Sequence, residues 1–214
     1  MNFFPLFTNV QDGEVFLCGT DALEKLPVLR PFGMRLRLFC ENVPCDGAGL
    51  APLLEIVPRP LEEADLDSCP CFVVTAQSEA EDGRIAALCR GRNIPVNAVD
   101  RPELCSFIFP SLITRDKLCV AISTGGASPA AAVELKRRIA EILPAEMDEI
   151  LDWACAKRGE IYARVSDRRL ARELVCRSVQ RAMEKGRVLT EEEMAAAAAS
   201  TFEECGDVHR DGGL

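Results

Sequence analysis

Short apolar runs alternate with amphipathic stretches over the first hundred residues of the chain. Runs of this length, bounded by turn residues, are typical of buried strands, and the stretches between them fit helices. Strands that alternate with helices predict an α/β fold, a Rossmann-like parallel sheet whose ligand lies outside the carboxyl ends of the strands. The predicted strands are residues 15–19, 34–40, 53–57, 71–77 and 94–100.

Two helices are expected between these strands. The first covers residues 21–32 and should be short or irregular, because Pro27 and Pro31 each remove a backbone donor, and Gly33 ends it. The second covers residues 80–92, where the apolar positions recur at helical spacing.

The pattern changes after residue 100. Residues 106–116 and 117–126 are predicted as two β segments, and Ser128 and Pro129 then suit the cap and first position of a helix that stops at Pro144. Helical character continues from residue 146 to about residue 204, with breaks near Ser166 and Gly186. We expect a Rossmann-like domain at 1–112, a β/α segment at 113–145, and a helical region with a polar tail at 146–214.

The composition narrows the classes of partner. The chain has 214 residues and a formal net charge of −9, which disfavours a nucleic-acid partner because such binding depends on Lys and Arg contacts to phosphates. No window approaches the length of a membrane-spanning apolar helix, and no basic segment precedes an apolar one at the start. We therefore expect a soluble cytoplasmic protein without a membrane partner.

The cysteines do not suggest disulfides or a metal site. There are 11 of them, an odd number, and most lie inside apolar runs, so we interpret them as reduced core thiols. Cys69 and Cys71 form the tightest cluster, but no second pair follows at zinc-site spacing, and His209 is the single histidine.

Four segments occur in an order that carries a resemblance to a known family. They are FPLF at 4–7, NAVD at 97–100, SFIFPS at 106–111 and AISTGGASPAAAVELKRRI at 121–139. In this order they resemble the precorrin-2 dehydrogenase/sirohydrochlorin ferrochelatase family, a module that occurs alone or fused to a methyltransferase. No methyltransferase domain follows here, so we expect the stand-alone form.

The resemblance implies NAD-dependent oxidation of precorrin-2 to sirohydrochlorin in siroheme biosynthesis, with Fe(II) as a candidate chelation substrate. It also implies a homodimer formed through the segment 113–145. The family's catalytic aspartate falls on Asp100, which would accept protons in both steps and approach the metal transiently during chelation. The alternative is that Asp100 is a turn residue, because Asp100-Arg101-Pro102 is also good turn chemistry.

The same resemblance places tetrapyrrole contacts in the loop before the helix at 129. Glycines and a helix start let backbone amides approach substrate carboxylates, although Ser128 could equally be a plain helix cap. The predicted substrate-binding residues are Asn97, Ser106, Thr124, Gly125, Gly126 and Ser128.

The nucleotide site departs from the family's pattern. Leu17 stands where the first glycine of the fingerprint is expected, and the charge of Asp21 would compete with a diphosphate for the same amides. Glu41 lies about twenty residues after Gly19, where an acid binds ribose hydroxyls, or it is a solvated loop acid. The predicted cofactor-binding residues are Gly19, Thr20, Asp21, Glu41, Asn42 and Thr75.

Two other interpretations stay open. One is a tetrapyrrole-binding protein or chelatase that has lost NAD binding, which Leu17 and Asp21 motivate, and the other is an unrelated Rossmann-like protein, because fold does not specify chemistry. Arg168, Arg169 and Arg172 in the helical region would either meet substrate carboxylates or form a solvated helical face.

Overall fold

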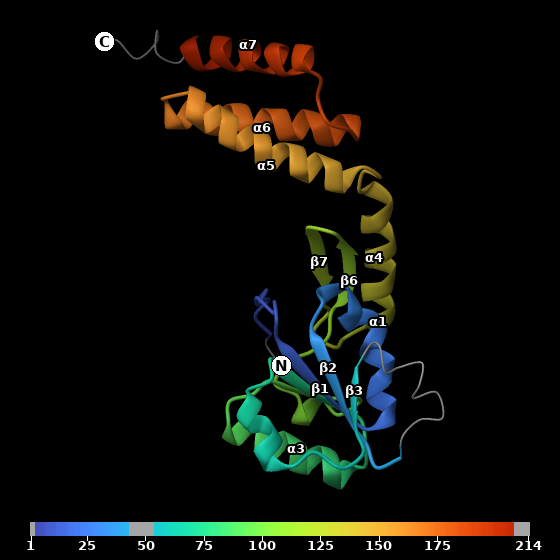
Figure 1. Ribbon diagram of the computed structural model, residues 1–214. Coiled ribbons are helices and arrows are strands. Elements are labelled where there is room, and N and C mark those ends of the chain that lie inside the picture. The colour runs from blue at the N-terminus through green and yellow to red at the C-terminus, as the bar shows by residue number, and fades with distance from the viewer. Residues whose placement is uncertain (1–2, 43–53, 208–214) are drawn as a thin grey trace, which may run out of the picture. The chain divides into compact units, whose positions relative to one another are not determined.

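The computed structural model describes residues 3–42 and 54–207, and of residues 204–207 the backbone alone. The chain forms two compact units, Met1–Pro110 and Ser111–Leu214. Figure 1 shows their elements, with the parallel sheet in the first unit and the long helices in the second.

A five-stranded parallel sheet organises the first unit, in the order β3-β2-β1-β4-β5. The chain therefore builds outward from β1 to β3, then returns to the other side of β1 to add β4 and β5. This reversal creates a switch point between β1 and β4. The strands are β1 (Glu14–Cys18), β2 (Arg35–Phe39), β3 (Glu55–Val57), β4 (Phe72–Thr75) and β5 (Val96–Ala98).

The central strand β1 is buried on both faces. Phe16 and Cys18 belong to one apolar cluster, which includes Ile85 of α3 (Glu79–Gly91). Val15 and Leu17 point to the other, which includes residues of α1 (Leu26–Leu29). Continuous apolar runs are what a strand covered on both faces requires, and the predicted α/β class is confirmed.

The first crossover is irregular, as its prolines predict. It consists of the 3-10 turns η1 (Thr20–Lys25) and η2 (Arg30–Phe32) on either side of α1, and Gly33 ends it with a φ of 66°. The second crossover, α3, is regular, and the side chain of Ser78 caps it by accepting a hydrogen bond from Glu81 N at 3.3 Å. Two further 3-10 turns are η3 (Glu63–Ser68) and η4 (Pro102–Leu104).

Several predicted strands are longer than the observed ones; those predicted at 71–77 and 94–100 end at Thr75 and Ala98. The third strand begins at Glu55; its expected start, Leu53, lies outside the described residues. Residues 106–110 are not part of a strand, because Ser106 is bonded to Val96 and the rings of Phe107 and Phe109 pack edge-to-face against Phe72 at centroid distances of 5.1 and 6.2 Å. The strand begins after Pro110, which has no amide to donate.

The second unit begins with an antiparallel hairpin and continues as four helices. Asp116, with a φ of 34°, turns β6 (Ser111–Arg115) into β7 (Leu118–Ile122), and α4 (Pro129–Ile142) packs on this hairpin. The helices α5 (Met147–Arg164), α6 (Arg168–Lys185) and α7 (Glu191–Asp207) follow. The breaks fall where the sequence places them, with Asp167 capping α6 and Gly186 ending it in the left-handed region.

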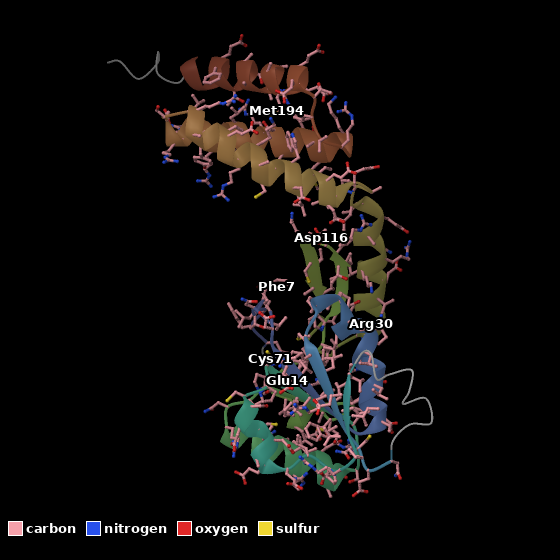
Figure 2. The ribbon with its side chains drawn as sticks, in the orientation of Figure 1. Phe7, Glu14, Arg30, Cys71, Asp116 and Met194 are labelled. Carbon is pink, nitrogen blue, oxygen red and sulfur yellow. The ribbon has the colours of Figure 1, made fainter. Side chains whose placement is uncertain are left out.

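The three long helices share two small apolar clusters. One contains Ile161, Ala171 and Leu174, and the other contains Ile150, Ala182 and Leu189. Met194 on α7 packs against both clusters and is labelled in Figure 2. Most apolar positions of these helices are covered within the unit, although Phe202 of α7 is 48% exposed.

Candidate functional site

A cleft of about 740 Å³ lies at the carboxyl ends of β1, β2 and β4. This is the edge of a parallel sheet at which a switch point forms a ligand crevice. Five of the six predicted cofactor-binding residues line it, namely Gly19, Thr20, Asp21, Glu41 and Asn42. The other lining residues are Cys40, Pro60, Leu61, Glu62, Ala76, Gln77, Ser78, Glu81 and Arg84.

Gly19 brings the backbone unusually close to the neighbouring strand end. Its φ is 87° with a ψ of 150°, a conformation restricted to glycine, and its amide donates to Phe39 O at 2.9 Å. A Cβ atom at this position would lie 2.5 Å from Ala76 O and 2.6 Å from Gln77 Cγ. Only glycine therefore fits the turn from β1 into the cleft.

Leu17 and Asp21, the two departures from the fingerprint, differ in their consequences. The Leu17 side chain is fully buried in the core and does not line the cleft, so it changes the strand and not the binding surface. Asp21 is exposed and lines the cleft. Of the two, Asp21 is the residue that alters the chemistry a ligand meets.

The cleft lining is strongly acidic. Four carboxylates line it, and Arg84 is the single Lys or Arg among the lining residues. Arg84 is already engaged, since Nη2 donates to Glu81 Oε1 at 2.5 Å and to Leu61 O at 2.7 Å. The hydrogen bond from Arg84 holds the pKa of Glu81 below its usual value. The carboxylates are Asp21, Glu41, Glu62 and Glu81.

These residues fit a dinucleotide at one end better than at the other. Glu41 follows β2 as an exposed carboxylate, suited to accepting hydrogen bonds from ribose hydroxyls. The turn at Gly19 packs closely against Ala76 and Gln77. The negative charge of Asp21 is unfavourable beside a diphosphate.

Thr75, the sixth predicted cofactor residue, lies beneath the cleft and not in its lining. It is fully buried, and its hydroxyl donates to Asp82 Oδ1 at 2.5 Å. Asp82 is also fully buried, accepts from Gln77 N at 3.1 Å, and forms an ion pair with Arg101. Arg101 in turn donates to Gln77 O at 3.4 Å.

This Thr75–Asp82–Arg101 network ties the loop after β4 to the turn after β5. The sequence pattern predicts a turn at Arg101 and no special role for Asp82. No local pattern separates Asp82 from the other acids in the first turn of α3, because its partner Arg101 lies 19 residues further along the chain. The network fixes both a wall of the cleft, through Gln77, and the position next to Asp100.

Asp100 lies in the turn directly after β5. Its φ of 61° is in the left-handed region, which aspartate tolerates better than most residues, and its side chain is exposed. The amide of Arg101 donates to Ala98 O at 3.2 Å and closes the turn. Turn chemistry and an available carboxylate therefore occur together at Asp100, on the same edge of the sheet as the cleft.

Asn97 and Ser106, two predicted substrate contacts, make hydrogen bonds between β5 and the segment that follows its turn. Asn97 is 8% exposed, and its Nδ2 donates to Phe107 O at 3.0 Å. Ser106 Oγ accepts from Val96 N at 2.8 Å. Both side chains hold the segment 105–107 against β5, which makes them supports of the turn that carries Asp100.

The remaining predicted substrate contacts form one loop in the second unit. Thr124 Oγ1 accepts from Ser128 N and donates to Ser128 O, each at 3.1 Å, and Ser128 Oγ accepts from Ala131 N at 3.2 Å to cap α4. Gly125 and Gly126 both have positive φ and are exposed, and a Cβ on either would meet no atom within 4 Å. The helix-cap role of Ser128 is present, and the Gly125 amide donates to Ser123 Oγ at 3.1 Å.

The described residues contain neither a metal-binding cluster nor a membrane-spanning helix. Across residues 3–42 and 54–207, no group of three His, Cys, Asp or Glu side chains is arranged to hold a metal ion. Over the same part of the chain, every helix is too short or too polar to cross a bilayer.

Comparisons with known proteins identify relatives of both units. Residues 6–111 match the family described as putative NAD(P)-binding, and residues 115–142 match the family described as sirohaem biosynthesis protein, central. The siroheme synthase of Thioalkalivibrio sulfidiphilus (strain HL-EbGR7) is 35% identical over 176 residues, which cover 80% of this chain and 36% of the relative. That of Ectopseudomonas mendocina (strain ymp) is 32% identical over 209 residues, or 92% of this chain and 45% of the relative.

The chain thus spans less than half the length of these curated relatives. Among solved structures, SirC, a precorrin-2 dehydrogenase, matches with a TM-score of 0.63 and 16% identity, over 94% of this chain and 100% of that one. At this identity the likeness concerns the fold.

Proposed function

We propose that this chain, which belongs to the precorrin-2 dehydrogenase/sirohydrochlorin ferrochelatase family, oxidises precorrin-2 to sirohydrochlorin with NAD as the hydride acceptor. The observation that carries the proposal is geometric. The predicted cofactor residues gather in one cleft at the switch point of the sheet, and Asp100 follows β5, the strand beside β4, at the same edge.

The residues that would hold the dinucleotide divide by role. Glu41 and Asn42 would bind the adenosine ribose. The protein backbone at Gly19 and Thr20 would lie beside the diphosphate, and the charge of Asp21 would limit the affinity for NAD. When bound, NAD accepts a hydride from the substrate. Glu41 also disfavours a phosphate on the ribose, so we propose NAD over NADP. Thr75 acts indirectly, because its hydroxyl holds Asp82.

Asp100 is the proposed proton acceptor. An exposed carboxylate in a fixed turn can take the proton that leaves as the substrate loses a hydride. Asn97 and Ser106 keep this turn on β5 and so position the carboxylate. The exposed loop Thr124–Ser128 would receive substrate carboxylates at Gly126, since the Gly125 amide is bonded to Ser123 Oγ. Insertion of Fe(II), a substrate of the second step, would use Asp100 again to accept pyrrole protons.

We include a homodimer in the proposal. The segment 113–145 exposes large apolar side chains on α4, with Val133 62% and Ile142 78% exposed, and such a face is suited to a second copy. Sedimentation of the chain at micromolar concentration tests this: a monomer would contradict it.

The decisive experiment compares two aspartates in the same backbone conformation. Asp100→Asn keeps a residue that tolerates positive φ and removes the proton acceptor, so NADH formation from precorrin-2 should fall by about 10²- to 10⁴-fold. Asp12→Asn is the matched control, because Asp12 is exposed with a φ of 58° and should retain full activity.

Each result of this experiment has a defined meaning. Equal activity of the two variants would remove Asp100 from the reaction. A natural chain that forms no NADH while a known dehydrogenase does so in parallel would overturn the oxidation itself.

One observation favours a second function, a tetrapyrrole chelatase that has lost NAD binding. The cleft presents four carboxylates and a single, engaged arginine. Calorimetric titration with NAD separates the two functions: micromolar binding by the natural chain supports the dehydrogenase, whereas binding that appears only in Asp21→Asn supports the chelatase. Leu17 is left unchanged in this test because its side chain packs in the core.

A further inference from the structure

Five arginines near the turn between α5 and α6 lack acidic partners. Among the described residues, no ion pair or hydrogen bond involves their guanidinium groups, whereas those of Arg137 and Arg187 pair with glutamates. All five are exposed. On a chain with a net charge of −9 this is an unusual concentration of available positive charge. They are Arg158, Arg164, Arg168, Arg169 and Arg172.

The acidic residues of the same stretch are occupied elsewhere. Glu160 bonds to Lys157 at 3.0 Å, and Glu173 bonds to Arg177 at 2.8 Å. Asp167 caps α6 by accepting from the amides of residues 169 and 170, at 2.8 and 3.1 Å. The arginines therefore keep both their charge and their hydrogen-bond donors for a group from outside the unit.

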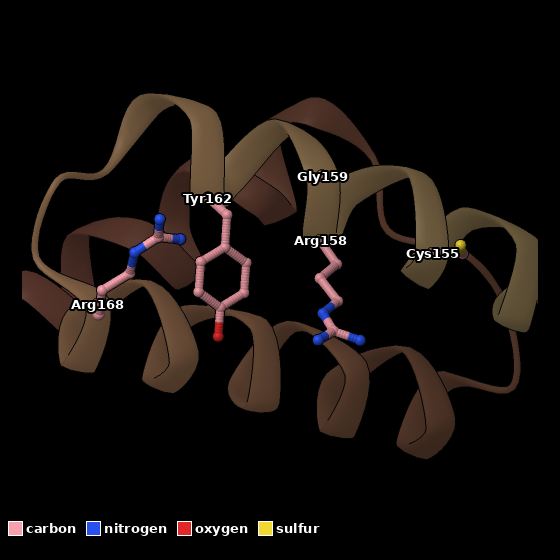
Figure 3. A pocket seen from close by; sticks show the side chains of 5 residues that line it. All are labelled: Cys155, Arg158, Gly159, Tyr162 and Arg168. Carbon is pink, nitrogen blue, oxygen red and sulfur yellow. The ribbon is translucent and has the colours of Figure 1, made fainter.

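Two of these arginines are held in a pocket by an aromatic ring. The pocket, of about 480 Å³, is lined by Cys155, Arg158, Gly159, Tyr162 and Arg168. The guanidinium carbons of Arg158 and Arg168 lie 5.9 and 5.4 Å from the centroid of the Tyr162 ring. Figure 3 shows the ring between the two guanidinium groups.

Tyr162 gives this arrangement its rigidity. The ring packs on the apolar cluster formed by α5, α6 and α7, so it is a fixed platform and not a loose surface side chain. Stacking on a ring orders a guanidinium group without using its N–H donors. The pocket thus presents two oriented forks, one from α5 and one from the start of α6, with a tyrosine between them.

We propose that Arg158, Tyr162 and Arg168 form a carboxylate-binding subsite for the tetrapyrrole on the helical unit. A guanidinium fork matches a carboxylate with two parallel hydrogen bonds, and two forks in one pocket select a ligand with more than one carboxylate. The inference rests on the proposed function, which supplies such a ligand: precorrin-2 and sirohydrochlorin both carry several carboxylate side chains. Nucleic acid is disfavoured by the net negative charge of the chain.

The test uses sirohydrochlorin as the probe and two charge-matched double variants. Arg158→Gln with Arg168→Gln removes the two forks of the pocket, and Arg164→Gln with Arg172→Gln removes two arginines of the same stretch that do not line it. Calorimetric titration should show an affinity at least tenfold lower for the pocket variant, since charge-assisted hydrogen bonds are lost. The control should change less than threefold. All four positions are exposed on helices, so both variants should fold.

A kinetic readout separates this subsite from the proposed function. The pocket variant should leave kcat for precorrin-2 unchanged, because the pocket residues touch no reacting atom. Equal affinity of the pocket and control variants, with normal turnover by the natural chain, would overturn the subsite alone. A natural chain that neither binds sirohydrochlorin nor forms NADH would overturn the proposed function, and the subsite with it.

Discussion

Arginine is used in opposite ways in the two units of this chain. In the first, Arg101 is paired with the fully buried Asp82, and its other donor reaches a backbone carbonyl. In the second, Arg158 and Arg168 lie on a tyrosine ring and keep their donors free. A buried pair fixes geometry, because neither charge can find another partner, whereas exposed oriented arginines remain available to a ligand. The first kind of arginine holds the backbone of a site in place, and the second kind is available to bind a ligand.

The largest expected effect comes from breaking the buried pair. Asp82→Asn removes the carboxylate that holds Arg101 and weakens the bonds from Thr75 and Gln77. The free energy of unfolding should fall by about 3 kcal/mol, the lower end of the range for a buried pair, because Arg101 keeps partial access to water. Urea unfolding followed by circular dichroism measures it.

The control makes the same substitution in an exposed pair. Asp67 forms an ion pair with Arg92, and its side chain is 69% exposed, so Asp67→Asn should cost at most about 1 kcal/mol. If Asp82→Asn were as mild as Asp67→Asn, the buried network would not hold the loops after β4 and β5, and the comparison between the units would lose its basis.

A glycine in each pocket gives the second test. Gly19→Ala places a Cβ 2.5 Å from a backbone oxygen at a φ of 87°, which should lower the stability by about 1–3 kcal/mol and weaken NAD binding. Gly159 lies in the interior of α5, and a Cβ added there would meet no atom within 4 Å. Gly159→Ala should therefore raise the free energy of unfolding by about 0.5–1 kcal/mol. Thermal unfolding of both variants checks the opposite signs, and equal signs would contradict the close approach at Gly19.

Much of the fold follows from the hydrophobic pattern. The runs at 15–19 and 71–77 predict β1 and β4 because strands buried on both faces need continuous apolar sequence. Gly186 and Ser166 mark the helix breaks for equally local reasons. The prediction of a strand at 106–110 was wrong, because the aromatic residues of this segment pack in a cluster and do not pair with another strand. Such tertiary packing cannot be read from the pattern of apolar and polar residues.

The site was predictable only in part. Gly19 and Glu41 are found by their spacing along a strand–turn–helix unit, and both line the cleft. Asp82 depends on which side chains meet across 19 residues of sequence, and nothing local distinguishes it from an exposed acid in a first helical turn. Leu17 lies in the core because its side chain points to one covered face of β1. The glycine fingerprint alone does not show this, so it does not reveal whether Leu17 affects the cleft.

The smallest expected effect contrasts a buried with an exposed thiol. Burial raises the pKa of Cys89 from 9.0 to about 11, so its stabilising contribution is complete below pH 9 and is lost as the pH rises through about 11. At pH 10 the loss should approach ~1.4 kcal/mol relative to pH 8. Cys89→Ala should make the alkaline decline shallower without abolishing it, because burial also raises the pKa of Cys18.

Cys155→Ala provides the control, since solvent surrounds the Cys155 thiol in the folded and unfolded chain alike. Urea unfolding at pH 8, 9 and 10 compares the slopes, and the comparison of slopes is unaffected by the cavity that Cys89→Ala leaves at every pH. If the free energy of unfolding fell with pH equally in the two variants, ionisation of the Cys89 thiol would not be disfavoured by its burial. A shallower slope for Cys89→Ala alone would show that the sheet unit excludes an unpaired charge from its interior, although it holds the paired charge of Asp82.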